Sequence, residues 1–316
     1  MEILKPIFDD SFYNERVSRT IPFLGRTVEE QKEAQEKLSK AVVGIAGAGG
    51  IGGAMAVRLA RFGIKHIKIA DPGDFDASNI NRQLGATKSN QGKNKAKTVG
   101  KMAYEVAEDV TIEIFEEGLT EKTAEEFVSN CDIILDQVDF SLIEDKYALH
   151  RAFRKEPKCK TILACSVIGW SAHLYKFEKD SMPIEEWYSF EDHSNIISLA
   201  RDERTEKLLK YWAPRFPHFP KLESIMEWIK ENDALPIFAG APPLAEGFLT
   251  QRVILCLLDK EYPPYAQTLP PIPYIYIYDA ATLSGDFYLS NGDLHNQNEI
   301  EKMWSSYDSS RKVSRK

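Results

Sequence analysis

The chain has 316 residues, of which 43% are hydrophobic, so it can bury one large core or two modest ones. Its formal net charge of −8 argues against nucleic acid as the default partner, although a tRNA-borne substrate stays open. There is no apolar stretch of about 18 residues and no basic-then-apolar leader, and we therefore expect a cytoplasmic protein without a membrane partner.

Residues 1–40 are predicted to form an N-terminal helical segment in two pieces, because the stretch is polar and Gly25 interrupts it. The second piece, residues 29–38, is charged on almost every side. We therefore expect it to cover the neighbouring strand only through Ala34 and Leu38.

A strand, a glycine-rich turn, a helix and a second strand are predicted next. The apolar run at 42–46 predicts the first strand, residues 54–62 the helix and residues 67–70 the second strand. Asp71 follows about 20 residues after the turn, where a carboxylate can accept hydrogen bonds from ribose hydroxyls. Glycines in such a turn let the backbone approach phosphates at a helix N-terminus, where free N–H groups and the helix dipole favour anions. The sequence therefore predicts a nucleotide site, and its turn glycines are Gly47, Gly49, Gly50 and Gly52.

A polar loop and a lysine-bearing helix start follow the second strand. Arg82 lies in the loop at 78–83. Residues 92–96, which include Lys95, open a helix that is expected to run to residue 107. Both cations would flank the phosphates from the side opposite the glycine turn and stabilise charge in phosphoryl-type chemistry. The other lysines of this helix share one face and are interpreted as solvent-exposed: Lys93, Lys97 and Lys101.

Strand and helix patterns alternate up to residue 177. This alternation predicts an α/β fold with a Rossmann-like, twisted, mostly parallel sheet, which forms the nucleotide-binding domain at residues 41–177. One strand leads into Asp136 and Asp139 at the carboxyl edge of the sheet, where ligands bind and where a carboxylate can hold Mg²⁺ on a triphosphate. The predicted strands are 110–115, 132–135, 161–166 and 172–177, and the predicted helices are 120–128 and 143–153.

The composition changes near residue 178. Residues 178–240 lose periodicity and carry three tryptophans and a proline-rich run at 214–220, which contains His218, interpreted as a surface histidine. One interpretation of this stretch is an irregular insert that caps the sheet edge near the site. The four cysteines form no C-x-x-C pair, so neither a disulfide framework nor a zinc site is indicated. Three further candidates for chemistry are interpreted as core residues: Cys165, Cys256 and His173.

The C-terminal part, residues 241–290, is predicted to complete the sheet. It contains an apolar helix at 242–258 and two strand patterns, 275–278 and 286–289, that predict a hairpin around Ser284-Gly285. The polar tail at 291–316 is expected to be frayed.

These linked motifs resemble those of the ThiF/MoeB/HesA adenylyltransferases, bacterial relatives of ubiquitin-activating enzymes, over residues 17–260. The resemblance implies a homodimer, ATP and Mg²⁺ as cofactors, and a crossover insert at 178–240 that shapes an acyl-acceptor groove. It also implies that Arg19, in a segment that looks like the family's Ser-Arg-Asn-Ile, reaches into the partner subunit's ATP site. The resemblance assigns the other site residues as follows: Asp71 to the ribose, Asn79, Arg82 and Gln83 to the Asn-x-x-Arg-Gln loop at the phosphates, Lys95 to the Gly-x-x-Lys-Ala lysine, and Asp139 to the magnesium-site aspartate.

The sequence departs from the family pattern in ways that indicate a divergent branch. Asp74 stands one position later than the family's second aspartate, and Phe140 replaces the asparagine that is usual after the magnesium-site aspartate. Many relatives form a thioester on a cysteine in or after the crossover region, but residues 178–255 contain none. The resemblance therefore implies transfer of the activated acid to an amine, or to a thiol on a partner protein.

The implied chemistry is ATP- and Mg²⁺-dependent adenylation of a carboxylate, which gives an acyl-adenylate and pyrophosphate. No protein nucleophile or general base is needed, because a carboxylate is already ionised near pH 7. The acid stays open between a ubiquitin-like or peptide C-terminus, a peptide side chain, a small acid and a tRNA-borne acid. Two alternatives remain. An NAD(P)-binding oxidoreductase shares the glycine turn and Asp71 but leaves Arg82, Lys95 and Asp139 unexplained, and a catalytically silent partner subunit has no use for those three.

Overall fold

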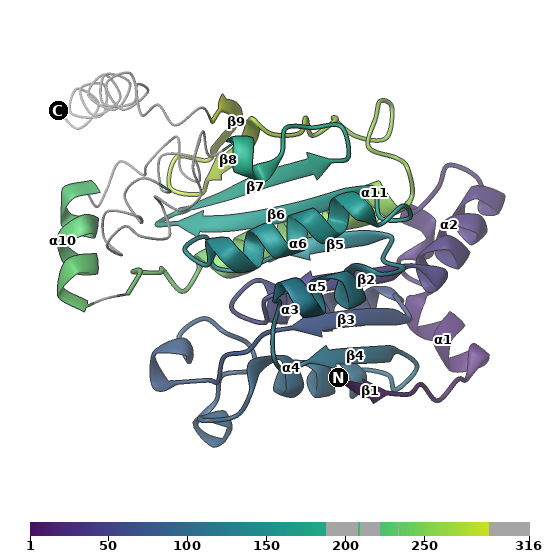
Figure 1. Ribbon diagram of the computed structural model, residues 1–316. Coiled ribbons are helices and arrows are strands. Elements are labelled where there is room, and N and C mark those ends of the chain that lie inside the picture. The colour runs from purple at the N-terminus through teal and green to yellow at the C-terminus, as the bar shows by residue number, and fades with distance from the viewer. Residues whose placement is uncertain (188–207, 209–221, 233, 291–316) are drawn as a thin grey trace, which may run out of the picture.

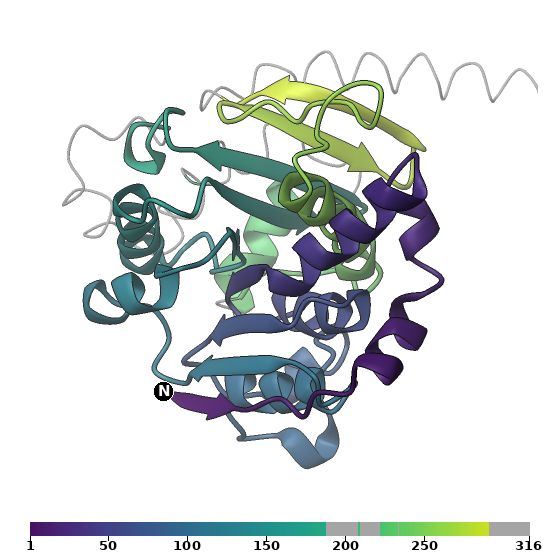
Figure 2. The same ribbon diagram turned by 90° about the vertical axis from the view of Figure 1, so that its right-hand side faces the viewer.

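The computed structural model describes residues 1–187, 208, 222–232 and 234–290. Its centre is a nine-stranded sheet with the strand order β1-β4-β3-β2-β5-β6-β7-β8-β9, and helices cover both of its faces (Figures 1 and 2). The strands are β1 (Glu2–Leu4), β2 (Val42–Ala46), β3 (His66–Ala70), β4 (Thr111–Phe115), β5 (Ile133–Asp136), β6 (Thr161–Ile168), β7 (Ser171–Glu178), β8 (Tyr274–Asp279) and β9 (Ser284–Leu289).

The five central strands, from β4 through β3, β2 and β5 to β6, run parallel to one another. Antiparallel strands extend this parallel centre at both edges: β1 pairs with β4, and β7, β8 and β9 continue from β6. The α/β class and the Rossmann-like sheet predicted from the alternating patterns are confirmed. The carboxyl ends of the parallel strands meet at one edge, which is where such sheets bind ligands.

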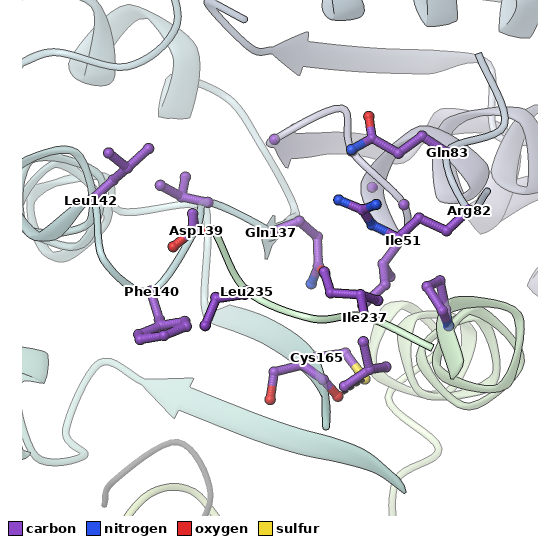
Figure 3. Close-up of a pocket in the computed structure, with 18 of the residues that line it drawn as sticks. Ile51, Arg82, Gln83, Gln137, Asp139, Phe140, Leu142, Cys165, Leu235 and Ile237 are labelled. Carbon is purple, nitrogen blue, oxygen red and sulfur yellow. Dashed lines mark hydrogen bonds between the residues drawn. The ribbon is translucent and has the colours of Figure 1, made fainter. Parts of the chain in front are cut away.

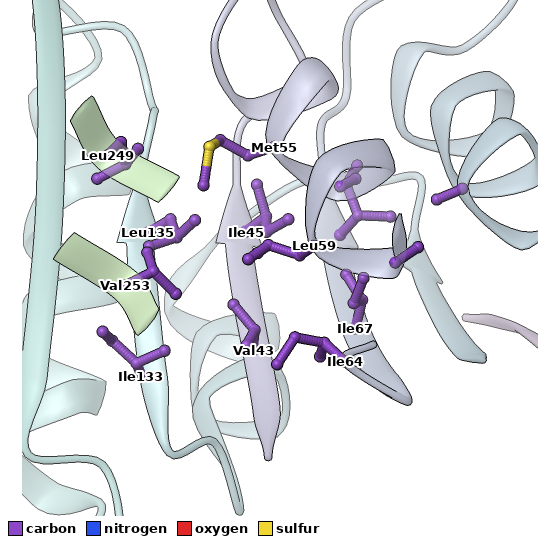
Figure 4. Close-up of a cluster of buried hydrophobic side chains, with 14 of the residues drawn as sticks. Val43, Ile45, Met55, Leu59, Ile64, Ile67, Ile133, Leu135, Leu249 and Val253 are labelled. Carbon is purple, nitrogen blue, oxygen red and sulfur yellow. The ribbon is translucent and has the colours of Figure 1, made fainter. Parts of the chain in front are cut away.

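Two apolar clusters fill the space between the sheet and its helices. Because side chains alternate along β2, Val43 and Ile45 belong to one cluster, whereas Val42 and Ala46 belong to the other. Figure 4 shows the first cluster, in which Met55 of α3 packs beside the strand residues. The helices that supply the first cluster are α2 (Val28–Lys40), α3 (Gly52–Phe62), α4 (Lys95–Tyr104) and α11 (Ala241–Leu257). Those that supply the second are α5 (Glu121–Val128), α6 (Ile143–Lys155) and α7 (Ile184–Trp187).

Local signals in the sequence explain where several helices begin and end. Helix α3 ends at Gly63, whose φ of 102° is left-handed and whose N–H donates to the carbonyl groups of Leu59 and Ala60. Helix α5 begins at Thr120, which forms a capping box with Thr123. A left-handed glycine thus ends α3, and a threonine side chain caps the start of α5.

Two predictions about local structure were confirmed only in part. Residues 1–40 contain the two predicted helical pieces, α1 (Asp10–Val17) and α2, on either side of Gly25, but the segment begins with β1, which pairs with β4. Three residues are too few to show a strand period, so only the free edge of β4 makes this strand favourable. The C-terminal hairpin is confirmed, but its turn is 280–283, since Ser284 already pairs with Asp279. The Asp279 carboxylate fixes that turn by accepting the N–H groups of Ala281 and Thr282.

The 178–240 stretch is described in part. Helices α7 (Ile184–Trp187) and α10 (Leu222–Asn232) belong to it, and the buried Trp187 donates its indole N–H to the carbonyl group of Ser290. The predictions for the proline-rich run, for His218 and for the tail at 291–316 fall outside the described residues. Among the helices that are described, none is both long enough and apolar enough to span a bilayer.

Candidate functional site

A cavity of about 770 Å³ opens at the carboxyl edge of the parallel strands. Its lining comes from the segments that directly follow β2, β3, β5 and β6, and from the residues between α10 and α11. Figure 3 shows Arg82 and Gln83 on one side of this cavity and Asp139, Phe140 and Leu235 on the other. A volume of this size lies within the range of small-molecule and cofactor sites.

The glycine turn after β2 forms one wall of the cavity, and its glycines differ in function. A Cβ on Gly47 would lie 2.3 Å from the carbonyl oxygen of Gln137, and a Cβ on Gly52 would lie 1.9 Å from that of Gly47. These two glycines therefore allow close backbone packing. A Cβ on Gly49 would have no neighbour closer than 3.8 Å, where Gln83 lies. Gly49 thus leaves open space at the start of α3, where no side chain caps the helix and the first N–H groups can meet an anion.

The end of β3 is tied to the glycine turn through Asp71. Its carboxylate accepts the backbone N–H of Ala48 at 2.7 Å and that of Gly73 at 2.8 Å. Lys95 reaches the same place from the start of α4: its own N–H donates to the Gly73 carbonyl, and its Nζ lies 3.6 Å from where a Cβ on Gly73 would be. Asp71 and Lys95 therefore both line the cavity near Gly73.

The loop after β3 brings a second cation to the cavity. The Arg82 guanidinium donates from Nη1 to the Ser78 carbonyl oxygen at 3.1 Å and to Asn81 Oδ1 at 2.9 Å, which holds it against the loop. Burial lowers the pKa of Arg82, and the charge of Asp76 opposes this shift. Its charge persists, because a guanidinium stays protonated in proteins.

Two predicted amide side chains behave differently from each other. Gln83 is buried and lines the cavity, and its Oε1 has no hydrogen-bond partner among the described residues. A buried acceptor without a partner is costly unless a ligand supplies a donor. Asn79 is also buried but does not line the cavity. The backbone carbonyl oxygen of Asn79 accepts the backbone N–H groups of Arg82 and Gln83, so Asn79 shapes the loop that carries them.

The two carboxylates predicted at the end of β5 have separate roles. Asp139 lines the cavity, and its Oδ1 accepts the N–H and the hydroxyl group of Ser141. Asp136 also borders the cavity, but it is 1% exposed, and its carboxylate lies 2.8 Å from Lys146 Nζ and 3.1 Å from His150 Nε2. Of the two carboxylates predicted at this edge, Asp139 is therefore the one that a ligand can reach. Lys146 and His150 sit one turn apart on α6, where Lys146 balances the charge of Asp136 and His150 lies within hydrogen-bond distance of it.

The buried group around Asp136 also holds the loop that carries Asp139, because Asp136 Oδ1 accepts the N–H of Val138. Burial raises the pKa of Asp136, but the charge of Lys146 and the hydrogen bond from His150 outweigh burial and lower that pKa to about 2. Burial lowers the pKa of His150, against the opposite effect of Asp136. At neutral pH this group is a buried ion pair with a neutral imidazole beside it.

The donor set fits Mg²⁺ only together with phosphate oxygens. Within the described residues, no group of three or more His, Cys, Asp or Glu side chains could hold a metal ion alone. Mg²⁺ commonly takes one or two protein carboxylates and completes its octahedron with substrate phosphates and water. Asp139 is suited to that arrangement, since it stands in the same cavity as Arg82 and Lys95.

Arg19, like Asn79, is a predicted site residue that does not line this cavity. It is exposed and lies between α1 and α2, which stand at the edge of the sheet where β2 and β3 begin (Figure 1). The cavity lies at the opposite edge, where these strands end. Any contact of Arg19 with such a cavity therefore requires a second copy of the chain.

Sequence reasoning missed the apolar part of the cavity. Trp170, in the turn between β6 and β7, packs against Phe238 with 4.3 Å between the ring centroids and the ring planes tilted by 42°. Because Phe238 comes from a distant stretch without periodicity, no local pattern connects the two rings. Cys165 also lines the cavity, but it is buried, burial raises its pKa, and its prediction as a core residue is confirmed. All four cysteines are free thiols.

A Rossmann-like sheet with a glycine turn, an acid after the second strand and two facing cations defines a nucleotide-binding α/β protein. The chain belongs to the ThiF family, whose model matches residues 22–207. It is 33% identical over 105 residues to the adenylyltransferase and sulfurtransferase MOCS3 of Dictyostelium discoideum. This match covers 33% of this chain and 25% of that protein. This chain is also 32% identical over 109 residues to the tRNA threonylcarbamoyladenosine dehydratase of Bacillus subtilis strain 168. That match covers 34% of this chain and 43% of that protein. The matched region spans less than half the length of either relative.

Solved structures share the fold over most of the chain. PaaA has a TM-score of 0.61 and 18% sequence identity, and the match covers 90% of this chain and 76% of that one. E. coli MccB in complex with ATP has a TM-score of 0.61 and 16% identity, and the match covers 90% of this chain and 74% of that one. At these identities, the likeness establishes the fold.

Proposed function

We propose that the protein adenylates a carboxylate with ATP and Mg²⁺. A carboxylate oxygen forms a bond to the α-phosphorus, the bond from that phosphorus to the bridging oxygen of the β-phosphate breaks, and pyrophosphate leaves with the electron pair. The products are an acyl-adenylate and pyrophosphate. The observation that carries this proposal is the meeting of Asp71, Arg82, Lys95 and Asp139 with the glycine turn around one cavity.

Each side chain has a role that follows from its chemistry. Asp71 accepts hydrogen bonds from the ribose, while the open backbone at Gly49 and Gly50 receives phosphate oxygens at the start of α3. Arg82 and Lys95 neutralise the charge that develops as pyrophosphate leaves, and Gln83, whose Oε1 is unpaired among the described residues, orients a ligand donor. Catalysis then consists of positioning and charge stabilisation.

Asp139 is proposed as the Mg²⁺ ligand. The support is its place in the cavity and its tether to Ser141, which holds the carboxylate on the loop after β5. Bound there, Mg²⁺ would neutralise the phosphates. The chain's own contribution is to hold Asp139 in position, which the hydrogen bond from Val138 to the buried Asp136 supports.

The proposed assembly is a homodimer in which Arg19 serves the site of the partner subunit. Its exposure at the edge opposite its own cavity supports this assignment. Pairing about a two-fold axis is the commonest soluble assembly and would place both copies of Arg19 symmetrically.

The acid is proposed to be a ubiquitin-like or peptide C-terminus, a small acid or a tRNA-borne acid. Support comes from the names of the similar proteins: one is a molybdopterin-synthase adenylyltransferase of Porphyra purpurea, one a tRNA threonylcarbamoyladenosine dehydratase, and one MccB with MccA. The family match does not favour the oxidoreductase alternative. A silent partner subunit would bind ATP without catalysing exchange, so one assay separates it from an enzyme.

The test is exchange of labelled pyrophosphate into ATP, with Mg²⁺ and a panel of N-acetyl amino acids and a peptide ending in Gly-Gly. We expect acid-dependent exchange that falls by on the order of 10²-fold in Asp139→Asn and in Arg82→Ala, the loss typical of removing one charge stabiliser. Glu144→Gln, an exposed change near the same loop, is the matched control and should retain exchange. Full exchange by Asp139→Asn at saturating ATP would contradict the metal role, and binding of NAD in place of ATP would contradict the proposal.

A further inference from the structure

The cavity has two unlike parts. Arg82 and Lys95 stand at the nucleotide end, and they are the only cations among its described lining residues. The other end is apolar. Its walls come from the loop after β5, the β6–β7 turn, α10 and the stretch before α11: Phe140, Leu142, Trp170, Ile225, Leu235 and Phe238. Figure 3 shows Phe140 and Leu235 next to each other, on the same side of the cavity as Asp139 and across from Arg82.

The side chains at this apolar end are held in place by packing against one another. Ile225 and Ile229 of α10 are 9% and 5% exposed, and Phe140 and Leu235 pack against them in a cluster of their own. The ring contact between Trp170 and Phe238 joins the β6–β7 turn to the same wall. Leu142 and Phe238 nevertheless stay 48% and 46% exposed. Large apolar side chains gathered around a cavity mark a surface that an apolar ligand group covers.

The charges at this end limit what can enter. Asp145, in the first turn of α6, lines the cavity next to the apolar walls and makes no ion pair with any described residue. Burial and the neighbouring Glu144 raise its pKa. A ligand with a second carboxylate would meet Asp139 and Asp145 without a described cation to balance it, which is unfavourable at short range.

We propose that the acid activated at this site carries a large apolar group beside its carboxyl group and no second negative charge. The inference rests on the adenylation chemistry proposed above. The carboxyl group faces the nucleotide end, and the apolar group lies between Phe140, Trp170, Leu235 and Phe238. An aromatic or branched aliphatic residue at a peptide C-terminus satisfies both conditions, whereas a terminus made of glycines leaves the apolar walls uncovered.

Direct binding tests the inference apart from catalysis. We would measure equilibrium dialysis of radiolabelled N-acetyl-phenylalanine, N-acetyl-glycine and N-acetyl-glutamate with the whole protein, Mg²⁺ and α,β-methylene-ATP. Burial of a phenylalanine side chain predicts binding of N-acetyl-phenylalanine on the order of ten- to hundredfold tighter than that of N-acetyl-glycine. N-acetyl-glutamate should bind no better than N-acetyl-glycine.

Leu235→Ala should reduce the preference for N-acetyl-phenylalanine by about fivefold or more, because truncation removes part of the apolar wall. Ile7→Ala removes a similar aliphatic side chain that is 65% exposed outside the cavity, and it should change nothing. Thermal melting checks that both variants are folded. Equal binding of the three acids, or no binding of any, overturns the inference. Loss of pyrophosphate exchange with the binding preference intact would instead contradict the adenylation chemistry.

Discussion

Lys146→Met should destabilise the protein severely, because it leaves the Asp136 carboxylate charged and buried. Lys146 is 0% exposed and Asp136 is 1% exposed, and the ammonium group lies 2.8 Å from both carboxylate oxygens. Removing one partner of such a buried pair costs about 3–5 kcal/mol. This loss is a large share of the roughly 5–15 kcal/mol by which domains are stable.

The double variant Asp136→Asn/Lys146→Met is the matched control. It leaves no buried charge, and an asparagine Oδ1 can still accept the N–H of Val138, so most of the lost stability should return. Urea denaturation of the wild type and both variants, followed by circular dichroism, measures the free energy of unfolding. A loss below about 1 kcal/mol in Lys146→Met would refute the reasoning, since it would mean that Asp136 is not held as a buried carboxylate.

The buried group formed by Asp136, Lys146 and His150 also predicts how stability depends on pH. The pKa of His150 is lowered in the folded protein, so below the ordinary histidine value of about 6.5 the unfolded chain binds more protons and stability falls. The pKa of Asp136 is lowered to about 2, so its contribution is present above the ordinary aspartate value and is lost as the pH falls through that range towards about 2. Both effects lower the free energy of unfolding as the pH falls. In urea denaturation between pH 7 and 5, the free energy of unfolding should decline less steeply for His150→Gln than for the wild type. An equally steep decline would contradict the role given to His150.

Three further changes test other parts of the site. Gly49→Ala should melt like the wild type but bind ATP at least about tenfold more weakly by calorimetry. Gly52→Ala should lower the melting temperature, because its Cβ meets the backbone. Equal melting temperatures and equal ATP affinities of the two variants would contradict the two roles. Cys165→Ser should retain pyrophosphate exchange in proportion to folded protein, and a reducible adduct with substrate that depends on Cys165 would contradict its structural role. Mixing Arg19→Ala with Asp139→Ala chains should restore about one working site per mixed dimer, since both changes fall in the other site; mixed dimers without exchange would contradict action of Arg19 in the partner.

The nucleotide end of the cavity could be predicted from the sequence because its signals are local. The run at β2, the glycines and the stop at Gly63 lie within a short segment, and Asp71 follows directly. Lys95 could be separated from its neighbours because it opens a helix after a polar loop. In the structure Lys95 lines the cavity, while Lys97 pairs with Glu2 and Glu116.

The rest of the site depends on contacts between distant residues. The spacing of Lys146 and His150 on one helix face is visible in the sequence, but only the packing of α6 on the sheet turns both towards Asp136. The apolar end joins Trp170 to Phe238, and no period connects residues so far apart. Strand β1 is likewise defined by its partner β4 and carries no pattern of its own.

The most direct test of the account compares two lysines that lie close together in the chain. Lys95 lines the cavity, whereas Lys93 is exposed and contacts Asn90. Pyrophosphate exchange with saturating ATP, Mg²⁺ and N-acetyl-phenylalanine should fall by on the order of 10²-fold in Lys95→Ala and stay at the wild-type rate in Lys93→Ala. Equal exchange by the two variants, with both proteins folded, would contradict the proposed adenylation site.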